Sequence, residues 1–299
     1  MRKSLVVLGV LVSLTLIRYG MVHQSKSSDA QKTILNFESF GQGPGNLVLL
    51  HGLMASLHYW DGLIPELSKE NRVIAPDLFG FGDSPKPAAS YSVAEHLGFI
   101  ERTIDQAIGG TQKFFLIGHS MGTFLALDYA ALFPERIKGI ILIDPPVATA
   151  ENSLEDDLRA STSAIMLTMT FSKFWGKAAC RLHELFPLLM YPIIRMGDSD
   201  LPPRVAKDAL KHNWESFSGS LQHVLVEQNF EKLIENVGPL PILILGGVDD
   251  AHMKRKRLEK ILSSRSNVEL KWVKGRHNFL LKHPEDALNA IQPFIRANR

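Results

Sequence analysis

Short apolar runs recur along the chain from residue 46 onward and alternate with amphipathic stretches. The runs are rich in Val, Ile and Leu, which is typical of strands that are buried on both faces of a parallel sheet. Residues 92–108 and 122–133, which lie between runs, are helix candidates, so the order predicts βαβ units in a doubly wound, mostly parallel α/β sheet. The predicted strands are residues 46–50, 72–75, 113–117, 139–143, 241–246 and 268–273.

A long interval of different character separates the fourth predicted strand from the fifth. Residues 147 to about 217 are rich in Met and aromatic side chains and predict helices joined by Pro-containing turns. We expect residues 147–217 to form a helical cap that is inserted into the core, which then comprises residues 31–146 and 218–299. The apolar side chains of this interval fit the lining of a substrate cavity and fit ordinary packing on the sheet equally well.

The first thirty residues have the pattern of a signal peptide or a membrane anchor. Arg2 and Lys3 precede an uncharged apolar run of 13 residues, 5–17, which fits the ~7–15 residues of a secretory signal and falls short of the ~20 that span a bilayer. Ser28 and Ala30 offer a poor cleavage site, so an uncleaved anchor is the rival interpretation. We expect export or membrane association through this segment; a buried N-terminal helix and a start codon placed too early are the alternatives.

The composition excludes several classes of protein. With 45% hydrophobic and 21% charged residues the chain is an ordinary globular protein, and its formal net charge of +2 gives no electrostatic basis for a nucleic-acid partner. Cys180 is the only cysteine, so it forms no intramolecular disulfide, and we expect it to be small apolar filler. The histidines form no H-E-x-x-H motif, and the glycines of residues 41–45 predict a hairpin turn rather than a phosphate cradle. We therefore expect no metal and no cofactor.

The strongest chemical signal is the G-x-S-x-G motif formed by residues 118–122. It lies directly after the predicted strand 113–117 and directly before the predicted helix 122–133, which is the setting of a nucleophile elbow. The two glycines permit the close backbone approach that such a turn requires. Ser120 is thus a candidate nucleophile, and a serine hydroxyl needs an adjacent base that is itself oriented by a third group.

Two further motifs follow predicted strands in the same chain order. His51 and Gly52 end the strand 46–50, and residues 77–84, with the sequence DLFGFGDS, follow the strand 72–75. With the elbow, these motifs resemble the α/β-hydrolase family, whose members commonly carry an HG turn, a D-x-x-G-x-G-x-S loop and the elbow after successive strands. The resemblance implies the α/β-hydrolase fold, with the cap inserted after the sixth strand of the family's numbering.

The resemblance also implies a histidine base late in the chain. His277 lies in the loop after the strand 268–273 and is similar in position to the family's histidine before its last helix. His283 is the local competitor, but it precedes Pro284 at the start of a predicted helix over 285–295, so we expect it to cap that helix or to be solvated.

Three aspartates are candidates for the group that orients His277. Aligning residues 241–247 with the family's P-x-x-x-x-x-G strand selects Asp250, whereas counting from Gly246 selects Asp249. Asp144 is the third candidate, because some family members carry the acid after the preceding strand. The order Ser120, Asp250, His277 agrees with the order of the triad in this fold, and we expect Asp250 to be the acid.

Acyl transfer also requires hydrogen-bond donors for the oxyanion. The resemblance implies that the backbone amides of Met121, directly after the nucleophile, and of Leu53, after the HG turn, supply them. The sequence has neither the HGGG form of lipases nor the proline that is common after HG.

These observations predict a serine hydrolase that cleaves a small-molecule ester of an apolar acyl group through an acyl-enzyme. A serine at the elbow argues against the dehalogenases and most epoxide hydrolases of the family, which place an aspartate there. A C–C bond hydrolase, a thioesterase or an acyltransferase with the same triad, and a non-catalytic ligand receptor, are the alternatives that remain, because the fold does not choose among them.

Overall fold

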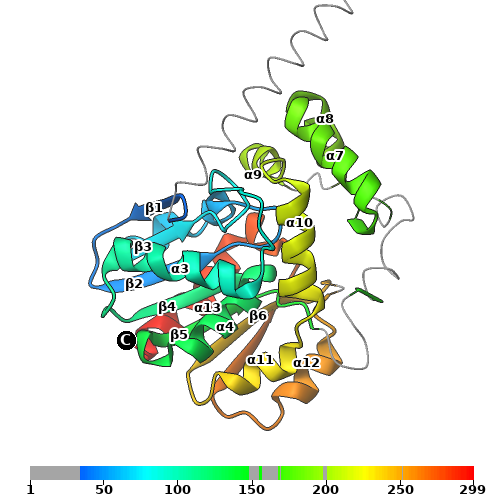
Figure 1. Ribbon diagram of the computed structural model, residues 1–299. Coiled ribbons are helices and arrows are strands. Elements are labelled where there is room, and N and C mark those ends of the chain that lie inside the picture. Colours follow the sequence, from blue (N-terminus) through cyan, green and yellow to red (C-terminus); the bar gives the residue numbers. More distant parts are fainter. Residues whose placement is uncertain (1–33, 148–154, 157–167, 169, 198–200, 251) are drawn as a thin grey trace, which may run out of the picture.

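The structure, a computed structural model, describes residues 34–147, 155–156, 168, 170–197, 201–250 and 252–299. These residues contain a seven-stranded sheet with helices on both faces (Figure 1). The strand order is β1-β3-β2-β4-β5-β6-β7, in which β1 is antiparallel to β3 and the other neighbours are parallel. The predicted doubly wound sheet is therefore confirmed. The strands are β1 Phe37–Phe40, β2 Gly45–Leu50, β3 Asn71–Pro76, β4 Phe114–His119, β5 Ile137–Ile143, β6 Ile242–Gly247 and β7 Val268–Val273.

The edge strand β1 is absent from the sequence prediction, and the predicted hairpin turn over residues 41–45 is wrong. β2 already has parallel neighbours on both sides, β3 and β4, so the preceding strand has no place beside it. β1 pairs instead with the free edge of β3, where Phe37 lies opposite Pro76. Gly41 has a φ of 69°, and a side chain there would clash with the backbone of Ser68 and Asn71.

Two hydrophobic cores lie on the two faces of the sheet. Alternate residues of β2 point to opposite faces, Val48 and Leu50 into one core and Leu47 and Leu49 into the other, as a strand buried on both faces requires. The first core is covered by α3 Val93–Ile108, α4 Met121–Leu132, α11 Phe230–Asn236 and α12 Arg255–Leu262, and the second by α2 Ile64–Leu67 and α13 Pro284–Ala297.

Most of the described residues between β5 and β6 are helical. Figure 1 shows the helices over residues 173–208 at one end of the sheet, whereas α11 packs against α4 on one face. The outer helices α7 and α8 pack against each other, while α9 and α10 lie nearer the sheet. The predicted cap boundary at about residue 217 falls inside α10, and the division into core and cap stays a prediction. The elements are α7 Lys173–Leu185, α8 Pro187–Gly197, α9 Pro203–Asp208, α10 Trp214–Ser220 and the π-helical turn η3 Leu221–Val226.

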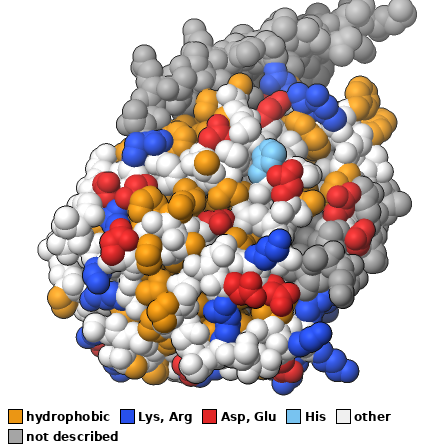
Figure 2. All heavy atoms as spheres, turned by 60° about the horizontal axis from the view of Figure 1, so that its bottom comes forward, with side chains coloured by type: hydrophobic (Ala, Val, Ile, Leu, Met, Phe, Trp, Pro, Cys, Tyr) orange, Lys and Arg blue, Asp and Glu red, His pale blue; other side chains and the backbone are white. Residues whose placement is uncertain are grey.

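No helix in the part of the chain that the structure describes combines the length and the apolar character needed to cross a bilayer. The segment for which we expect export or membrane association, residues 1–30, lies outside the described residues, so that expectation stays a prediction. On the face shown in Figure 2, basic and acidic side chains are interspersed.

Candidate active site

Ser120 occupies a strained turn between β4 and α4. Its φ of 50° and ψ of −118° lie in a region that non-glycine residues rarely adopt, and its N–H donates to the Ile143 carbonyl at 3.0 Å. A side chain at Gly118 would clash with the carbonyl of Gly122, and one at Gly122 would clash with the carbonyl of Leu50. The G-x-S-x-G spacing is thus required by the backbone packing that holds the serine hydroxyl above the strand ends.

The loops after β6 and β7 bring an acid and an imidazole to this serine. His277 Nε2 lies 2.9 Å from Ser120 Oγ, and His277 Nδ1 lies 2.8 Å from Asp250 Oδ2. The Asp250 side chain is 1% exposed, whereas that of His277 is 27% exposed. The three residues therefore form a hydrogen-bonded chain that runs from a buried carboxylate to a hydroxyl within reach of a ligand.

The electrostatics of Asp250 suit a group that holds an imidazolium. Burial acts to raise the pKa of Asp250, but the hydrogen bond from His277 and the charge of its ring bring the pKa below the ordinary value. The backbone N–H of His252 also donates to Asp250 Oδ1, at 2.8 Å. Asp250 is accordingly a charged acceptor that fixes His277 with Nδ1 as the donor.

The other residues considered for the acid and the base do not take part in this hydrogen-bonded chain. Asp249 is exposed. Asp144 is buried after β5 and accepts the Gly247 N–H at 2.7 Å; burial and the nearby charge of Asp250 raise the pKa of Asp144 well above its ordinary value. His283 precedes α13 without a side-chain cap hydrogen bond, and its ring is half exposed. Of the three aspartates, Asp250 is the one hydrogen-bonded to His277.

The turn that contains Leu53 lies against the serine. His51 Nδ1 donates to the Gly52 carbonyl at 2.8 Å, and His51 Nε2 accepts the Leu78 N–H at 2.8 Å. A side chain at Gly52 would come within 3.1 Å of Ser120 Cβ, so the backbone of this turn passes directly beside the candidate nucleophile. Burial lowers the pKa of His51 and favours the neutral ring that these two hydrogen bonds require.

Comparison with known proteins identifies the family. Residues 45–284 match the family model described as alpha/beta hydrolase fold. The chain belongs to the α/β-hydrolase fold family. Among solved structures, this α/β hydrolase is similar to a bromoperoxidase from Bacillus anthracis, with a TM-score of 0.71 and 19% identity over 90% of this chain and 98% of that one. A thermophilic esterase from Thermogutta terrifontis has a TM-score of 0.65 and 22% identity, over 88% and 93% of the two chains. At such identity the likeness shows the fold alone.

Curated relatives match a smaller part of the α/β hydrolase. "Probable lysophospholipase BODYGUARD 4" from Arabidopsis thaliana is 38% identical over 211 residues, which are 64% of this chain and 50% of that protein. "Probable lysophospholipase BODYGUARD 5" from the same plant is 33% identical over 141 residues, 45% of this chain and 30% of that protein. These matches span half or less of the length of the curated relatives.

The sequence analysis missed His119, which supports the loop that carries His277 in this α/β hydrolase. The ring of His119 stacks on Tyr59 at 4.2 Å between centroids, and its Nε2 donates to the His277 carbonyl at 3.0 Å. Burial lowers the pKa of His119 well below its ordinary value, so the ring is neutral. Its position inside the elbow motif was the one sign in the sequence that His119 lies near the site. Its two partners, Tyr59 and His277, are distant in sequence, so these contacts could not be predicted.

Asp77, the first residue of the D-x-x-G-x-G-x-S loop, organises the segments around the Leu53 turn. Its Oδ1 accepts the Leu57 N–H and its Oδ2 accepts the Asp83 N–H, both at 2.7 Å. Gly82 has a φ of 52°, and a side chain there would clash with the Asp77 carboxylate. The motif spacing therefore lets one carboxylate bind two loops at the edge of the site.

The inserted helices contact the same region through Asp208, the last residue of α9. Asp208 Oδ2 accepts from Ser56 Oγ at 2.8 Å and lies 2.5 Å from His58 Nδ1, and its Oδ1 lies 3.0 Å from Lys211 Nζ. Burial acts to raise the pKa of Asp208, but these three partners bring it below the ordinary value. A charged carboxylate thus joins α9 to the segment that follows the Leu53 turn.

Proposed function

We propose that this α/β hydrolase is a serine hydrolase that cleaves an ester of an apolar acyl group through an acyl-enzyme. The observation that carries the proposal is the hydrogen-bonded chain from Asp250 through His277 to Ser120, in which the serine stands on a strained turn. Strain of this kind persists where the surrounding structure imposes it, and it is typical of functional sites. A ligand receptor without catalysis has no need of it.

The proposed reaction follows from the roles of the three side chains. His277 Nε2 takes the proton of Ser120 Oγ as the hydroxyl attacks the ester carbonyl, and Asp250 stabilises the imidazolium that results. His277 then gives this proton to the leaving alcohol, and a water molecule activated by the same ring releases the acid. The backbone amides of Leu53 and Met121 are proposed to bind the oxyanion, because the first lies in the turn beside Ser120 and the second opens α4.

We propose an ester substrate from the comparisons, and an apolar acyl group from the Met- and aromatic-rich residues 147–217. The relatives named as probable lysophospholipases support an ester bond. An apolar pocket predicts that each acyl methylene it buries favours binding by ~0.8 kcal/mol until the pocket is full. Trp175 and Met169 are the candidates that the sequence offers for the lining of this pocket. Trp175 is half exposed on α7 and contacts the ring of Phe174, so we do not assign it to the pocket. Met169 lies outside the described residues.

The decisive test is covalent labelling of the purified full chain by a fluorophosphonate. Wild type is expected to be labelled and Ser120→Ala is not, with kcat for a p-nitrophenyl ester lowered by roughly 10⁴ or more. Ser264→Ala, on the surface, is the matched control and should be labelled as wild type is. Labelling of Ser120→Ala at the wild-type rate would contradict the proposal. If thioesters or C–C substrates were turned over faster than esters, the proposed roles of Ser120, His277 and Asp250 would stand, but the proposed substrate class would be wrong.

A further inference from the structure

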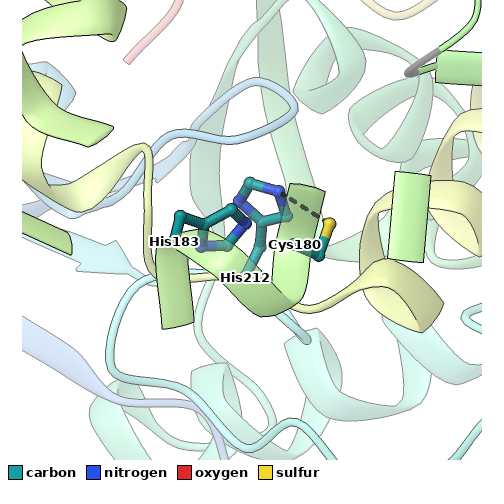
Figure 3. A group of neighbouring side chains, drawn as sticks. All are labelled: Cys180, His183 and His212. Atoms are coloured by element: carbon teal, nitrogen blue, oxygen red, sulfur yellow. Dashed lines mark hydrogen bonds between the residues drawn. The ribbon is translucent and has the colours of Figure 1, made fainter. Parts of the chain in front are cut away.

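A second group of reactive side chains lies between α7 and the segment that joins α9 to α10 (Figure 3). Cys180 and His183 are three positions apart on α7, so they share one face of that helix. His212 comes from the joining segment and points toward them. All three side chains belong to buried residues, at 7%, 6% and 5% exposure, and their ligand atoms all lie within 4.8 Å of one another.

The distances suit a shared metal ion. Cys180 Sγ lies 3.8 Å from His212 Nε2, and the rings of His183 and His212 have centroids 4.5 Å apart. In a tetrahedral zinc site with Zn–S of about 2.3 Å and Zn–N of about 2.0–2.1 Å, a sulfur and a nitrogen ligand are roughly 3.5 Å apart. Small side-chain rotations therefore bring the three ligand atoms around one ion.

His212 is already held in the orientation of a metal ligand. Its Nδ1 donates to the Ala209 carbonyl at 2.9 Å, and this leaves the lone pair of Nε2 directed at Cys180. Ligating histidines in proteins almost always donate their other ring N–H to a carbonyl or carboxylate in this way. Burial lowers the pKa of His212 to about 3, which keeps the ring neutral.

The surroundings of His183 give independent support for a metal site. Neither of its ring nitrogens meets hydrogen-bond geometry in the described part of the chain, although the Leu210 carbonyl lies near enough to act on its pKa. A buried ring nitrogen without a hydrogen-bond partner costs free energy, so the position of this imidazole requires an explanation. A metal ion would satisfy one ring nitrogen and leave the other for the Leu210 carbonyl.

We propose that Cys180, His183 and His212 bind one transition-metal ion, with zinc the best fit, and that a water or an exogenous ligand completes the coordination. One thiolate and two imidazoles are a ligand set of the softness that zinc prefers. Binding converts the Cys180 thiol to a thiolate, and its proton passes to solvent. The sequence expectation of no metal is revised by this proposal, because His212 is 32 positions from Cys180 and no local motif contains it.

The proposed ion would tie α7 and α8 to the rest of the molecule. α7 otherwise meets α10 through Gly176, where a side chain would clash with Trp214, and through the Lys177–Glu215 ion pair at 2.9 Å. The joining segment contacts the core, since Asn213 Nδ2 donates to the Lys86 carbonyl at 3.3 Å. A metal clip is therefore expected to stabilise the inserted helices rather than to take part in ester cleavage.

The test uses the full chain, stripped by a chelator and then dialysed against Zn²⁺ or Co²⁺. We expect one zinc per chain by elemental analysis, a thiolate-to-cobalt charge-transfer band, and a higher Tm with zinc than without. Cys180→Ser and His212→Gln should each weaken zinc binding by roughly 100-fold or more, and Cys180→Ser should also abolish the band. Wild type that retains no zinc and shows no thiolate band would overturn the proposal without any variant.

Two control variants separate this site from others. His119, Asp144 and His277 also place ligand atoms within 4.8 Å of one another, so His277→Gln tests the catalytic group. His277→Gln and the partly exposed His223→Gln should both keep the zinc and the cobalt band. Loss of the zinc in His277→Gln, or its retention in Cys180→Ser and His212→Gln, would place the ion elsewhere and overturn the assignment. Fluorophosphonate labelling of each variant reports the triad separately.

Discussion

At the scale of single residues, the environment of each carboxyl decides what it can do. Asp250 has two donors on its oxygens, His277 Nδ1 and the His252 N–H, which favour the charged form. Asp144 lies on the neighbouring strand end with one donor, the Gly247 N–H, and its other oxygen is buried without a hydrogen bond in the described part of the chain. Burial therefore favours the neutral form of Asp144 and not of Asp250.

The first prediction separates the candidate acids by kinetics. Asp250→Asn removes the acceptor of His277 Nδ1 and is expected to lower kcat by roughly 10⁴, because the imidazole then takes the wrong tautomer. Asp249→Asn, on the exposed neighbouring residue, is the matched control and should stay within about threefold of wild type, since its side chain is not hydrogen-bonded to Ser120 or His277. Steady-state kinetics on one ester measures both. The reverse ranking would show that Asp249 is the acid.

A second prediction concerns pH and Asp144. A carboxyl with a raised pKa in the folded chain contributes stability that is fully present below its unfolded pKa and is lost as pH rises through the folded pKa. The ordinary value is 3.8, so the stability of wild type relative to Asp144→Asn should fall as pH rises above about 4. Urea unfolding at a series of pH values measures the difference. A difference that is constant, or that grows with pH, would show that Asp144 is charged in the folded protein.

At the scale of elements, long periodic segments were predictable and short or non-local ones were not. The bounds of β7 match the prediction, and those of α3 differ from it by one residue. α3 begins after a capping box, in which the side chains of Ser92 and Glu95 each accept a hydrogen bond from the other's backbone N–H. β1 was missed because four half-exposed residues at a sheet edge carry too little periodicity. Its partner is β3, and that choice depends on which sheet edge is free.

Helix α3 also depends on a side chain from outside it. Arg136 Nη1 lies 2.6 Å from Glu101 Oε1 and 2.7 Å from Asp105 Oδ1, and its Nη2 donates to the Gly109 carbonyl after the helix. The Arg136 side chain is 6% exposed, so its removal leaves two carboxylates without their common partner. One guanidinium therefore holds α3 against the turn before β5.

The third prediction contrasts this cluster with a surface pair. Arg136→Met should lower the free energy of unfolding by about 3 kcal/mol, the lower end for a buried pair, because solvent screens Asp105. Lys69→Met breaks the exposed Lys69–Glu66 pair and should cost less than about 1 kcal/mol. Chemical denaturation of both variants tests the contrast. Equal losses would mean that the Arg136 cluster stabilises the fold no more than an exposed ion pair does.

At the scale of the whole molecule, the sequence predicted the architecture and left the candidate site partly open. The fold was predictable because βαβ order and three motifs after strands all point to one sheet edge. The strand alignment favoured Asp250 over Asp249 and Asp144, but it could not show the contact with His277, since that contact depends on how a loop of a few residues turns. The contacts of His119 with Tyr59, and of Cys180 with His212, join residues that no local pattern relates.

The position of His277 in the chain has a consequence for biosynthesis. It lies 157 residues after Ser120, and β6 and β7, whose loops carry Asp250 and His277, are the last strands to be made. At about 5–20 residues per second, a ribosome needs roughly 8–30 s to travel from the serine codon to the histidine codon. Throughout that time the nascent chain carries Ser120 without His277, so the proposed mechanism predicts that it is inactive. Chains arrested before residue 277 should escape fluorophosphonate labelling, and completed chains released from the same ribosomes should not.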